Sequence, residues 1–401
     1  MMKKKLLCVL LAAAFALTAV GCKGGDATVS FGALPWANSD YGNPQYEKTE
    51  YKVERFYCGG KEDELVAEGT YVSELTGSLS TAETEAYGAN CFKVKNTFSL
   101  TYNQSVHAAY TNETGGRLMN AGLTDSYDSE TFFSKESLAP VFARKTQNVA
   151  QRPLTDRDGV PFAPEAITEG LPEGVTARYV LPASVRYADP RGYEYRADYT
   201  NGVVQFATTK GTTTENKADG TYVRDYRLDP KEYSIKNNTR FDNEQLAYVV
   251  RAMDGCKRKG SGTFYLSSFY DSYVKDKYVR YTMGLSCADK NTDVTLSLDP
   301  AEIYIAGTEG ELPHDNGSYT VSCVQASVSI SSSSPGPAVS LLIADPSYKF
   351  AERNTVNADR TDGIATVKPV VRMTFTEYSY SSAKVNYRTV YTLASFHNRA
   401  A

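Results

Sequence analysis

Two sets of side chains alternate along much of the chain with a period of two, which is the pattern of β-strands. Around residues 51–58 and 92–98, one set is mainly Tyr, Val and Phe, and the other is richest in Lys. Strict alternation places each set on its own face of a sheet. Runs of Thr, Tyr, Val and Ser predict further strands over residues 124–134, 141–149, 261–270, 277–287, 292–305, 318–333, 338–344, 364–377 and 384–396.

A hairpin is predicted where two alternating runs meet at Asn201-Gly202. The run 193–199 precedes this pair, and 203–207 follows it. Asn-Gly is a strong hairpin signal because both residues tolerate a positive φ.

One segment, residues 242–253, has the period of a helix instead. Its apolar side chains fall at i, i+3, i+4 and i+7 and form one stripe: Leu246, Val249, Val250 and Met253. Asp242 and Gln245 have the spacing of a capping box, and Gly255 stands where a helix would stop. We expect this helix to cover a concave sheet face, with its stripe toward a ligand or toward the core.

The N-terminus has the layout of an export signal. Lys3, Lys4 and Lys5 precede an apolar stretch from Leu6 to Val20, which is shorter than the roughly 20 residues of a membrane-spanning helix. The ending Ala19-Val20-Gly21-Cys22 resembles the lipobox of bacterial lipoproteins, with Ala19 in place of the usual Leu. The resemblance implies cleavage before Cys22 and attachment of a diacylglyceryl group to its thiol. The alternative is an ordinary cleaved signal peptide with an incidental cysteine.

The signal peptide and its lipobox-like ending divide the chain into segments and predict that the protein lies in the cell envelope. We expect a signal peptide over residues 1–21, a lipidated cysteine and flexible tether over 22–46, and a β-rich domain over 47–401. Residues 150–182 are rich in proline and form either a long excursion from one sheet or a boundary between two β halves; we favour the excursion. The protein would then be held on the membrane by its lipid, facing outside the cytoplasm.

Charge and composition exclude several kinds of function. The whole chain has a net charge of −4; without residues 1–21, 40 Lys and Arg stand against 47 Asp and Glu, a net charge of −7. Nucleic acid is therefore not expected as a partner, because its binding requires a basic face. The sequence indicates no particular protein partner.

Candidate chemistry is sparse. We find no GxSxG, HExxH, P-loop or dinucleotide fingerprint, and no local motif pairs His107, His314 or His397 with a nucleophile. We therefore expect no catalytic residues, no cofactor and no metal. The 30 tyrosines either stack on sugars or line a lipid groove, or they are ordinary strand residues, which we favour.

Five cysteines remain after the signal and Cys22 are set aside. They are Cys58, Cys91, Cys256, Cys287 and Cys323, an odd number with no CxxC spacing. Their pairing stays open, and we favour buried thiols over a disulfide framework because a chain of this length does not need such staples.

The order of elements resembles bacterial envelope proteins of the lipoprotein-carrier half-barrel type and related secreted families of unknown function. The matching features are 125–131 leading through Ser137-Leu138-Ala139-Pro140 into 141–147, and the helix 242–253 followed by 262–270. The resemblance covers roughly residues 47–290. It implies one large, curved antiparallel sheet with a short helix in its concavity, and an apolar or acyl-chain ligand inside the curve.

Three functions follow as hypotheses. The first is a lipid-anchored, non-enzymatic protein that binds an apolar or acyl-chain ligand. The second is a two-sheet β-sandwich at the surface that binds glycan or protein. The third is an envelope hydrolase, which requires a carboxylate pair or a triad converging in space.

Overall fold

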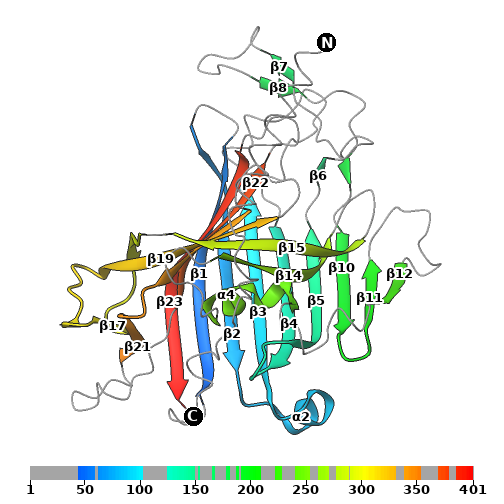
Figure 1. Cartoon of the computed structure of the whole chain (residues 1–401). Coiled ribbons are helices and arrows are strands. Elements are labelled where there is room, and N and C mark those ends of the chain that lie inside the picture. The colour runs from blue at the N-terminus through cyan, green and yellow to red at the C-terminus, as the bar shows by residue number, and fades with distance from the viewer. Residues whose placement is uncertain are drawn as a thin grey trace, which may run out of the picture.

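The computed structural model describes residues 44–58, 62–102, 124–149, 152–153, 165–167, 178–180, 187–188, 191–208, 222–227, 240–252, 261–270, 277–288, 290–330, 338–353, 369–378 and 385–400. Strands dominate these residues (Figure 1). The first half of the large sheet consists of β1 (Pro44–Tyr57), β2 (Glu64–Thr76), β3 (Cys91–Tyr102), β4 (Thr124–Ser134), β5 (Pro140–Val149), β10 (Arg191–Asp198), β11 (Val203–Thr208) and β12 (Tyr222–Arg227).

The second half of the sheet comes mainly from the C-terminal part of the chain. Its strands are β13 (Arg240–Asp242), β14 (Ser261–Tyr270), β15 (Lys277–Cys287), β16 (Thr292–Ser297), β19 (Ser318–Ile330), β20 (Val339–Ala344), β22 (Val370–Tyr378) and β23 (Val385–Ala400). Three smaller sheets complete the described strands: β17 (Ile303–Gly307) with β18 (Gly310–Glu311) and β21 (Lys349–Glu352), β6 (Arg152–Pro153) with β9 (Tyr187–Ala188), and β7 (Glu165–Ile167) with β8 (Arg178–Val180).

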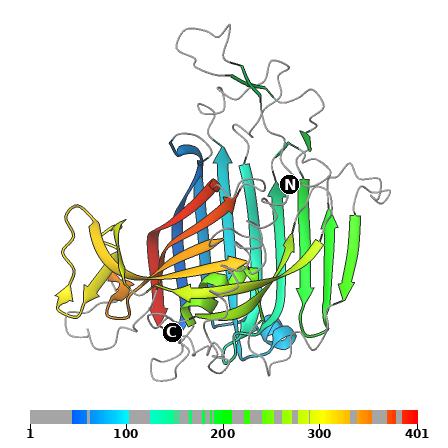
Figure 2. The same ribbon diagram turned by 45° about the horizontal axis from the view of Figure 1, so that its top comes forward.

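The large sheet is one continuous, open, half-barrel-like layer, which confirms the predicted fold class over the two-sheet sandwich. It has 16 strands in the order β12-β11-β10-β5-β4-β3-β2-β1-β23-β22-β20-β19-β15-β14-β13, with β16 paired to β19. The pairings are antiparallel except that β13 runs parallel to β14. The N- and C-terminal strands β1 and β23 pair over their length and join the halves. Figure 2 shows β14, β15 and β19 crossing in front of β1–β5.

The predicted helix lies in the concavity of this sheet. It starts as the 3-10 helix η6 (Asn243–Gln245) and continues as α4 (Leu246–Ala252). The predicted capping box is present, because the Asp242 carboxylate accepts from the backbone of Glu244 and Gln245 reaches back to the Asp242 amide. Contacts of η6 with β3, β4 and β14 place the helix between the two halves, as Figure 1 shows for α4.

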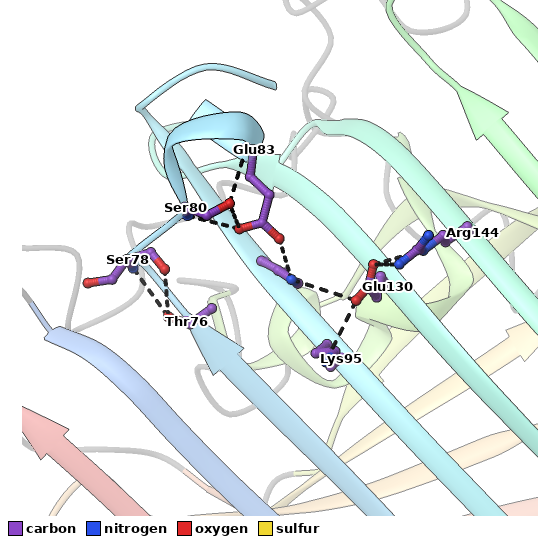
Figure 3. Close-up of polar contacts among 8 residues, drawn as sticks. Thr76, Ser78, Ser80, Glu83, Lys95, Glu130 and Arg144 are labelled. Atoms are coloured by element: carbon purple, nitrogen blue, oxygen red, sulfur yellow. Dashed lines mark hydrogen bonds and ion pairs between the residues drawn. The ribbon is translucent and has the colours of Figure 1, made fainter. Parts of the chain in front are cut away.

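The outer face of β1–β5 is ionic, as alternation requires once the inner face is apolar. Lys48, Glu74, Lys95, Glu130 and Arg144 stand opposite one another in register across five strands. Glu130 lies 2.6 Å from Arg144 and 3.8 Å from Lys95. Figure 3 shows Glu130 between these two side chains. Ion pairs in contact with water add little stability individually. The main consequence of these charges is that this face of the sheet is polar and hydrated.

A second helix, α2 (Thr81–Tyr87), covers one end of the outer face and was not predicted. Ser80 caps it, and the side chain of Glu83 returns to the Ser80 amide (Figure 3). The hydrogen bond from Lys93 is the main reason why the pKa of Glu83 falls to about 2, with the Ser80 amide contributing next. Tyr87 stacks on Phe132 with ring centroids 4.0 Å apart. The capping box Ser80–Glu83 was a readable signal for this helix.

The hairpin at Asn201-Gly202 exists with a longer turn than predicted. Asp198 pairs with Val203, so residues 199–202 form a four-residue loop. Gly202 has a φ of 66°, whereas Asn201 is not among the described residues with positive φ. Asn201 is held instead by the Asp198 carboxylate, which accepts from its backbone amide at 2.8 Å.

The predicted strand 292–305 is two strands, β16 and β17. They are separated by a turn at Asp299, whose carbonyl accepts from the amides of Glu302 and Ile303. Asp299 and Pro300 are the residues that end the alternation.

Cys58, Cys91 and Cys323 are free thiols, and the last two are buried. Burial raises the pKa of the Cys323 thiol to about 12. Cys256 and the side chain of Cys287 lie outside the described residues, as do the predicted signal peptide, Cys22 and most of 150–182. Neither helix among the described residues is long and apolar enough to cross a membrane.

Candidate functional site

A row of polar side chains runs straight across the concave face of the sheet. Thr49, Ser73, Asn96, Ser129 and Lys145 are successive register partners on β1 to β5. The first four are at most 4% exposed. Buried polar groups are costly unless they are hydrogen-bonded, so this row needs partners.

The helix supplies those partners. The Tyr248 hydroxyl lies 2.9 Å from the Ser73 hydroxyl, which donates to the Asn96 amide oxygen at 2.7 Å. The Asn96 amide nitrogen donates to the Glu244 carbonyl at 3.0 Å. The Glu244 carboxylate accepts from Ser129 at 3.2 Å and from Lys145 at 2.8 Å. The polar row is therefore a seat that fixes the start of the helix on the sheet.

Two further anchors hold the ends of the helix. At its C-terminal end, Arg251 donates two hydrogen bonds to the Glu47 carboxylate, at 2.5 and 2.9 Å, and both side chains are 3% exposed. At its start, Tyr199 donates to the Asp242 carboxylate. Burial, followed by repulsion from Glu244, raises the pKa of Asp242 to about 7.

The turn before β5 also meets the helix. Leu138 has a φ of 57°, an uncommon conformation for a residue with a side chain. Its side chain is buried, and its carbonyl accepts from the Gln245 amide at 2.8 Å. The turn Leu138-Ala139-Pro140 therefore binds Gln245, the residue that completes the capping box of the helix.

An aromatic surface begins two residues along each strand from the polar row. Tyr51, Tyr71, Phe98 and Tyr127 are successive register partners on β1 to β4. Phe98 and Tyr127 stack with centroids 5.0 Å apart. Tyr391 and Phe375 from the C-terminal strands join them. The ring centroid of Tyr391 lies 5.5 Å from that of Tyr71 and 5.2 Å from that of Phe375. We call these six residues the concave aromatic surface.

Four members of this surface are only half-buried, although all six belong to or pack against the main core. They are Phe98, Tyr127, Phe375 and Tyr391. Burial raises the pKa of Tyr71 and of Tyr391 well above the usual value for a phenol, so both hydroxyls stay neutral. The surface therefore offers rings and uncharged hydroxyls to whatever contacts it.

The comparisons with known proteins give no family. No protein-family model matches the chain, and no curated protein does. Among solved structures, a β-barrel-like protein of domain of unknown function DUF1849 from Brucella abortus aligns over 89% of this chain and 99% of its own, with 9% identity and a TM-score of 0.37. A DUF1329 family protein from Desulfovibrio piger aligns over 90% and 89%, with 7% identity and a TM-score of 0.20.

A third solved structure is the toluene transporter TodX from Pseudomonas putida. It covers 93% of this chain and 95% of its own, with 9% identity and a TM-score of 0.20. Similarities of this size carry no functional argument, so the function has to come from the residues of the chain itself.

The predicted helix stripe lies against the core. Leu246 is 6% exposed and Val249 and Val250 are fully buried, all in the main hydrophobic cluster. Met253 lies outside the described residues. The half-buried rings come from the sheet, and sequence analysis did not single them out. A readable signal for the polar row was Asn96, which occupies an inward position between Val94 and Phe98.

The three histidines have different surroundings. His107 lies outside the described residues, and His314 is a half-buried loop residue 3.6 Å from Glu311. His397 lies between the Ser395 hydroxyl and the Glu352 carboxylate, a contact that no local sequence motif indicated. Within the described ranges, no group of three His, Cys, Asp or Glu side chains could hold a metal ion.

Proposed function

We propose that this protein is a lipid-anchored envelope protein whose curved sheet binds an apolar or acyl-chain ligand without transforming it on that surface. The lipid would be attached at Cys22, on the strength of the lipobox-like ending of the signal. The described part of the chain would then face outside the cytoplasm and present its concave face to the ligand.

The half-buried concave aromatic surface is the observation that supports this proposal most. The helix covers the polar row, and the rings of Phe98, Tyr127, Phe375 and Tyr391 continue beyond it with part of their area exposed. An apolar ligand that covers this area removes it from water, and the free energy released favours binding.

The chemistry of this surface favours binding over reaction. The charged groups beside it form ion pairs within the protein, since Lys145 binds Glu244 and also lies 3.8 Å from the centroid of the Tyr127 ring. Arg55 likewise binds Glu377 at 2.8 Å. General acid-base catalysis needs a positioned group with a proton to exchange near the ligand. The neutral phenols and ion-paired charges supply no such group, so this surface suits a ligand that binds through its apolar area.

The ligand is tested with secreted protein carrying Cys22→Ser, so that the lipid anchor does not contribute acyl chains. Organic extraction and mass spectrometry should release an acyl or other apolar compound in near-stoichiometric amount. Phe375→Ala should weaken binding of a fluorescent fatty acid by about fivefold, since a ring contact is worth on the order of 1 kcal/mol. Tyr87→Ala removes a half-buried ring from the outer face and serves as the matched control.

The ligand proposal fails if the extract is empty and Phe375→Ala binds the probe as tightly as the unmodified chain. If glycan arrays or protein partners instead give a signal that Phe375→Ala abolishes, the concave aromatic surface binds a different class of molecule.

The anchor is tested separately by labelling cells with an alkyne-bearing palmitate. The chain should carry the label and sediment with membranes, and Cys22→Ser should lose both properties. Cys58→Ser, which changes a half-buried thiol in the folded part, should keep both. Label that persists in Cys22→Ser would overturn the assignment.

A further inference from the structure

His397 bridges a serine and a buried glutamate at the C-terminal end of β23. Its Nε2 lies 2.9 Å from the Ser395 hydroxyl, and its Nδ1 lies 2.9 Å from a Glu352 carboxylate oxygen. The Glu352 side chain is 9% exposed and that of His397 is 29% exposed. The inner carboxylate is thus sheltered, whereas the imidazole and the half-buried serine are reachable from water.

The fold holds these three groups together. Ser395 and His397 are two residues apart on one strand, so alternation points both to the same face. Glu352 arrives from β21, which packs beside this part of β23. Phe350 on β21 fixes that approach by meeting Phe396 edge-on, with centroids 5.9 Å apart and both rings fully buried.

The neighbouring strand does not compete for the imidazole. In register on β1, Glu50 stands opposite Ser395 and Lys48 stands opposite His397. Lys48 and Glu50 form an ion pair with each other at 2.5 Å. Each imidazole nitrogen therefore keeps one partner, a hydroxyl on one side and a carboxylate on the other.

We propose that Ser395, His397 and Glu352 form a nucleophile-base-carboxylate site that hydrolyses carboxylic esters of short acyl groups. With Nδ1–H donated to Glu352, the Nε2 lone pair accepts the Ser395 proton, which is the arrangement that activates a serine. Ser395 and His397 are the catalytic residues, and Glu352 is a positioning residue. The outer position of Ser395 beside two charged side chains suits a small acyl group better than a long chain.

The reaction balances with water as the second substrate. Ser395 Oγ forms a bond to the ester carbonyl carbon while its proton passes to His397 Nε2. The carbon–oxygen bond to the leaving alkoxide then breaks, and His397 returns the proton to form the alcohol. Water, activated by His397, attacks the acyl-serine, releases the carboxylic acid and restores the Ser395 hydroxyl.

This activity goes beyond the proposed binding role and stands apart from it in the fold. His397 and Tyr391 are six positions apart on β23, which is about 20 Å of extended chain. Ligand binding on the concave aromatic surface and ester hydrolysis at Ser395 can therefore succeed or fail independently.

The direct test treats the full chain, purified from membranes, with a fluorophosphonate probe and with p-nitrophenyl acetate. The probe should add one phosphonyl group, and peptide mapping should place it on Ser395. Ser395→Ala should not be labelled, and its rate of p-nitrophenyl acetate hydrolysis should fall at least tenfold. Ser347→Ala changes an exposed serine that donates to Asp345 and has no histidine partner, so it should keep both.

His397 and Glu352 need readouts that separate chemistry from folding. His397→Ala should lose labelling and regain part of it when imidazole is added. Glu352→Gln should label more slowly, because the imidazole loses the carboxylate that orients it, and Glu352→Asp should regain part of the rate. Labelling of the unmodified chain that occurs away from Ser395, or not at all between pH 6 and 9, overturns the proposal.

Discussion

Phe98 and Tyr391 lie on strands three places apart in the sheet, yet their ring centroids are 6.2 Å apart. Three strand spacings in a flat sheet amount to about 14 Å. The rings meet because the sheet curves and both side chains point inward. Tyr51 shows the same effect, since its hydroxyl on β1 reaches the Val370 carbonyl on β22 at 2.9 Å. Curvature therefore gathers the concave aromatic surface, and changes that disturb the curve should be costly.

Gly69→Ala should destabilise the protein by about 1–3 kcal/mol, as overpacking does. A Cβ at Gly69 would stand 1.8 Å from the Ser99 carbonyl oxygen, so the backbones of β2 and β3 would have to separate. Urea unfolding measures the change. Gly307→Ala is the control, because its Cβ would meet only side chains at ordinary contact distance and should change stability little.

Asn96→Ala should reduce the free energy of unfolding by about 1–3 kcal/mol, because it leaves buried groups without partners. Asn96 contacts Ser73, Ser129 and the Glu244 carbonyl at once. Asn90→Ala removes an exposed amide bonded to Glu136 and should change the same measurement by less than about 0.5 kcal/mol. Equal losses in the two variants would mean that the polar row does not seat the helix.

Glu47→Leu should lower the free energy of unfolding by about 3–5 kcal/mol, because it leaves the buried Arg251 charge unpaired. Combining it with Arg251→Met should recover most of that loss, because a paired apolar replacement removes the unpaired charge. Denaturant unfolding of the two single variants and the double variant measures the coupling. Glu54→Gln, at the more exposed Lys52 pair, should cost less than about 1 kcal/mol.

Stability should fall as pH rises from about 4 to about 7, and Asp242 should be one cause. Its pKa is raised from 3.8 to about 7 in the folded chain, so the folded state binds the proton that the unfolded state has released. The slope from this group is at most about 1.4 kcal/mol per pH unit. Above pH 7 the loss is complete.

Asp242→Asn should flatten that dependence, because the amide keeps a capping oxygen and does not titrate. Urea midpoints measured across pH 4.5–8 supply the test. Asp128→Asn changes an exposed carboxylate bonded to Thr97 and should leave the slope as it is. An unchanged slope in Asp242→Asn would assign the pH dependence to other groups.

Much of the fold could be predicted because its signals are local. The alternation around Phe92 and Val94, the apolar stripe from Leu246 to Val250 and the Asp242–Gln245 capping box are each read within a few neighbouring residues. The failures were local too: Asp299 interrupts the predicted strand 292–305, and the capping box that starts α2 at Ser80 was overlooked.

The candidate sites could not be predicted, because they depend on strand order and register. Period-two alternation tells which residues share a face, so Asn96 and Phe98 could be placed on one side of their strand. It does not tell that Asn96 stands opposite Ser73 and Ser129, which depends on how β2, β3 and β4 pair.

The sequence by itself determined the β-rich class, the helix and its cap, and the character of each strand face. Only the tertiary structure decided that β1 joins β23, that the sheet curves until Phe98 meets Tyr391, and that Glu352 reaches His397. The physical reason is the range of the interactions. Hydrogen bonding and side-chain period act between near neighbours in the chain, whereas register and curvature are fixed by contacts between residues hundreds of positions apart.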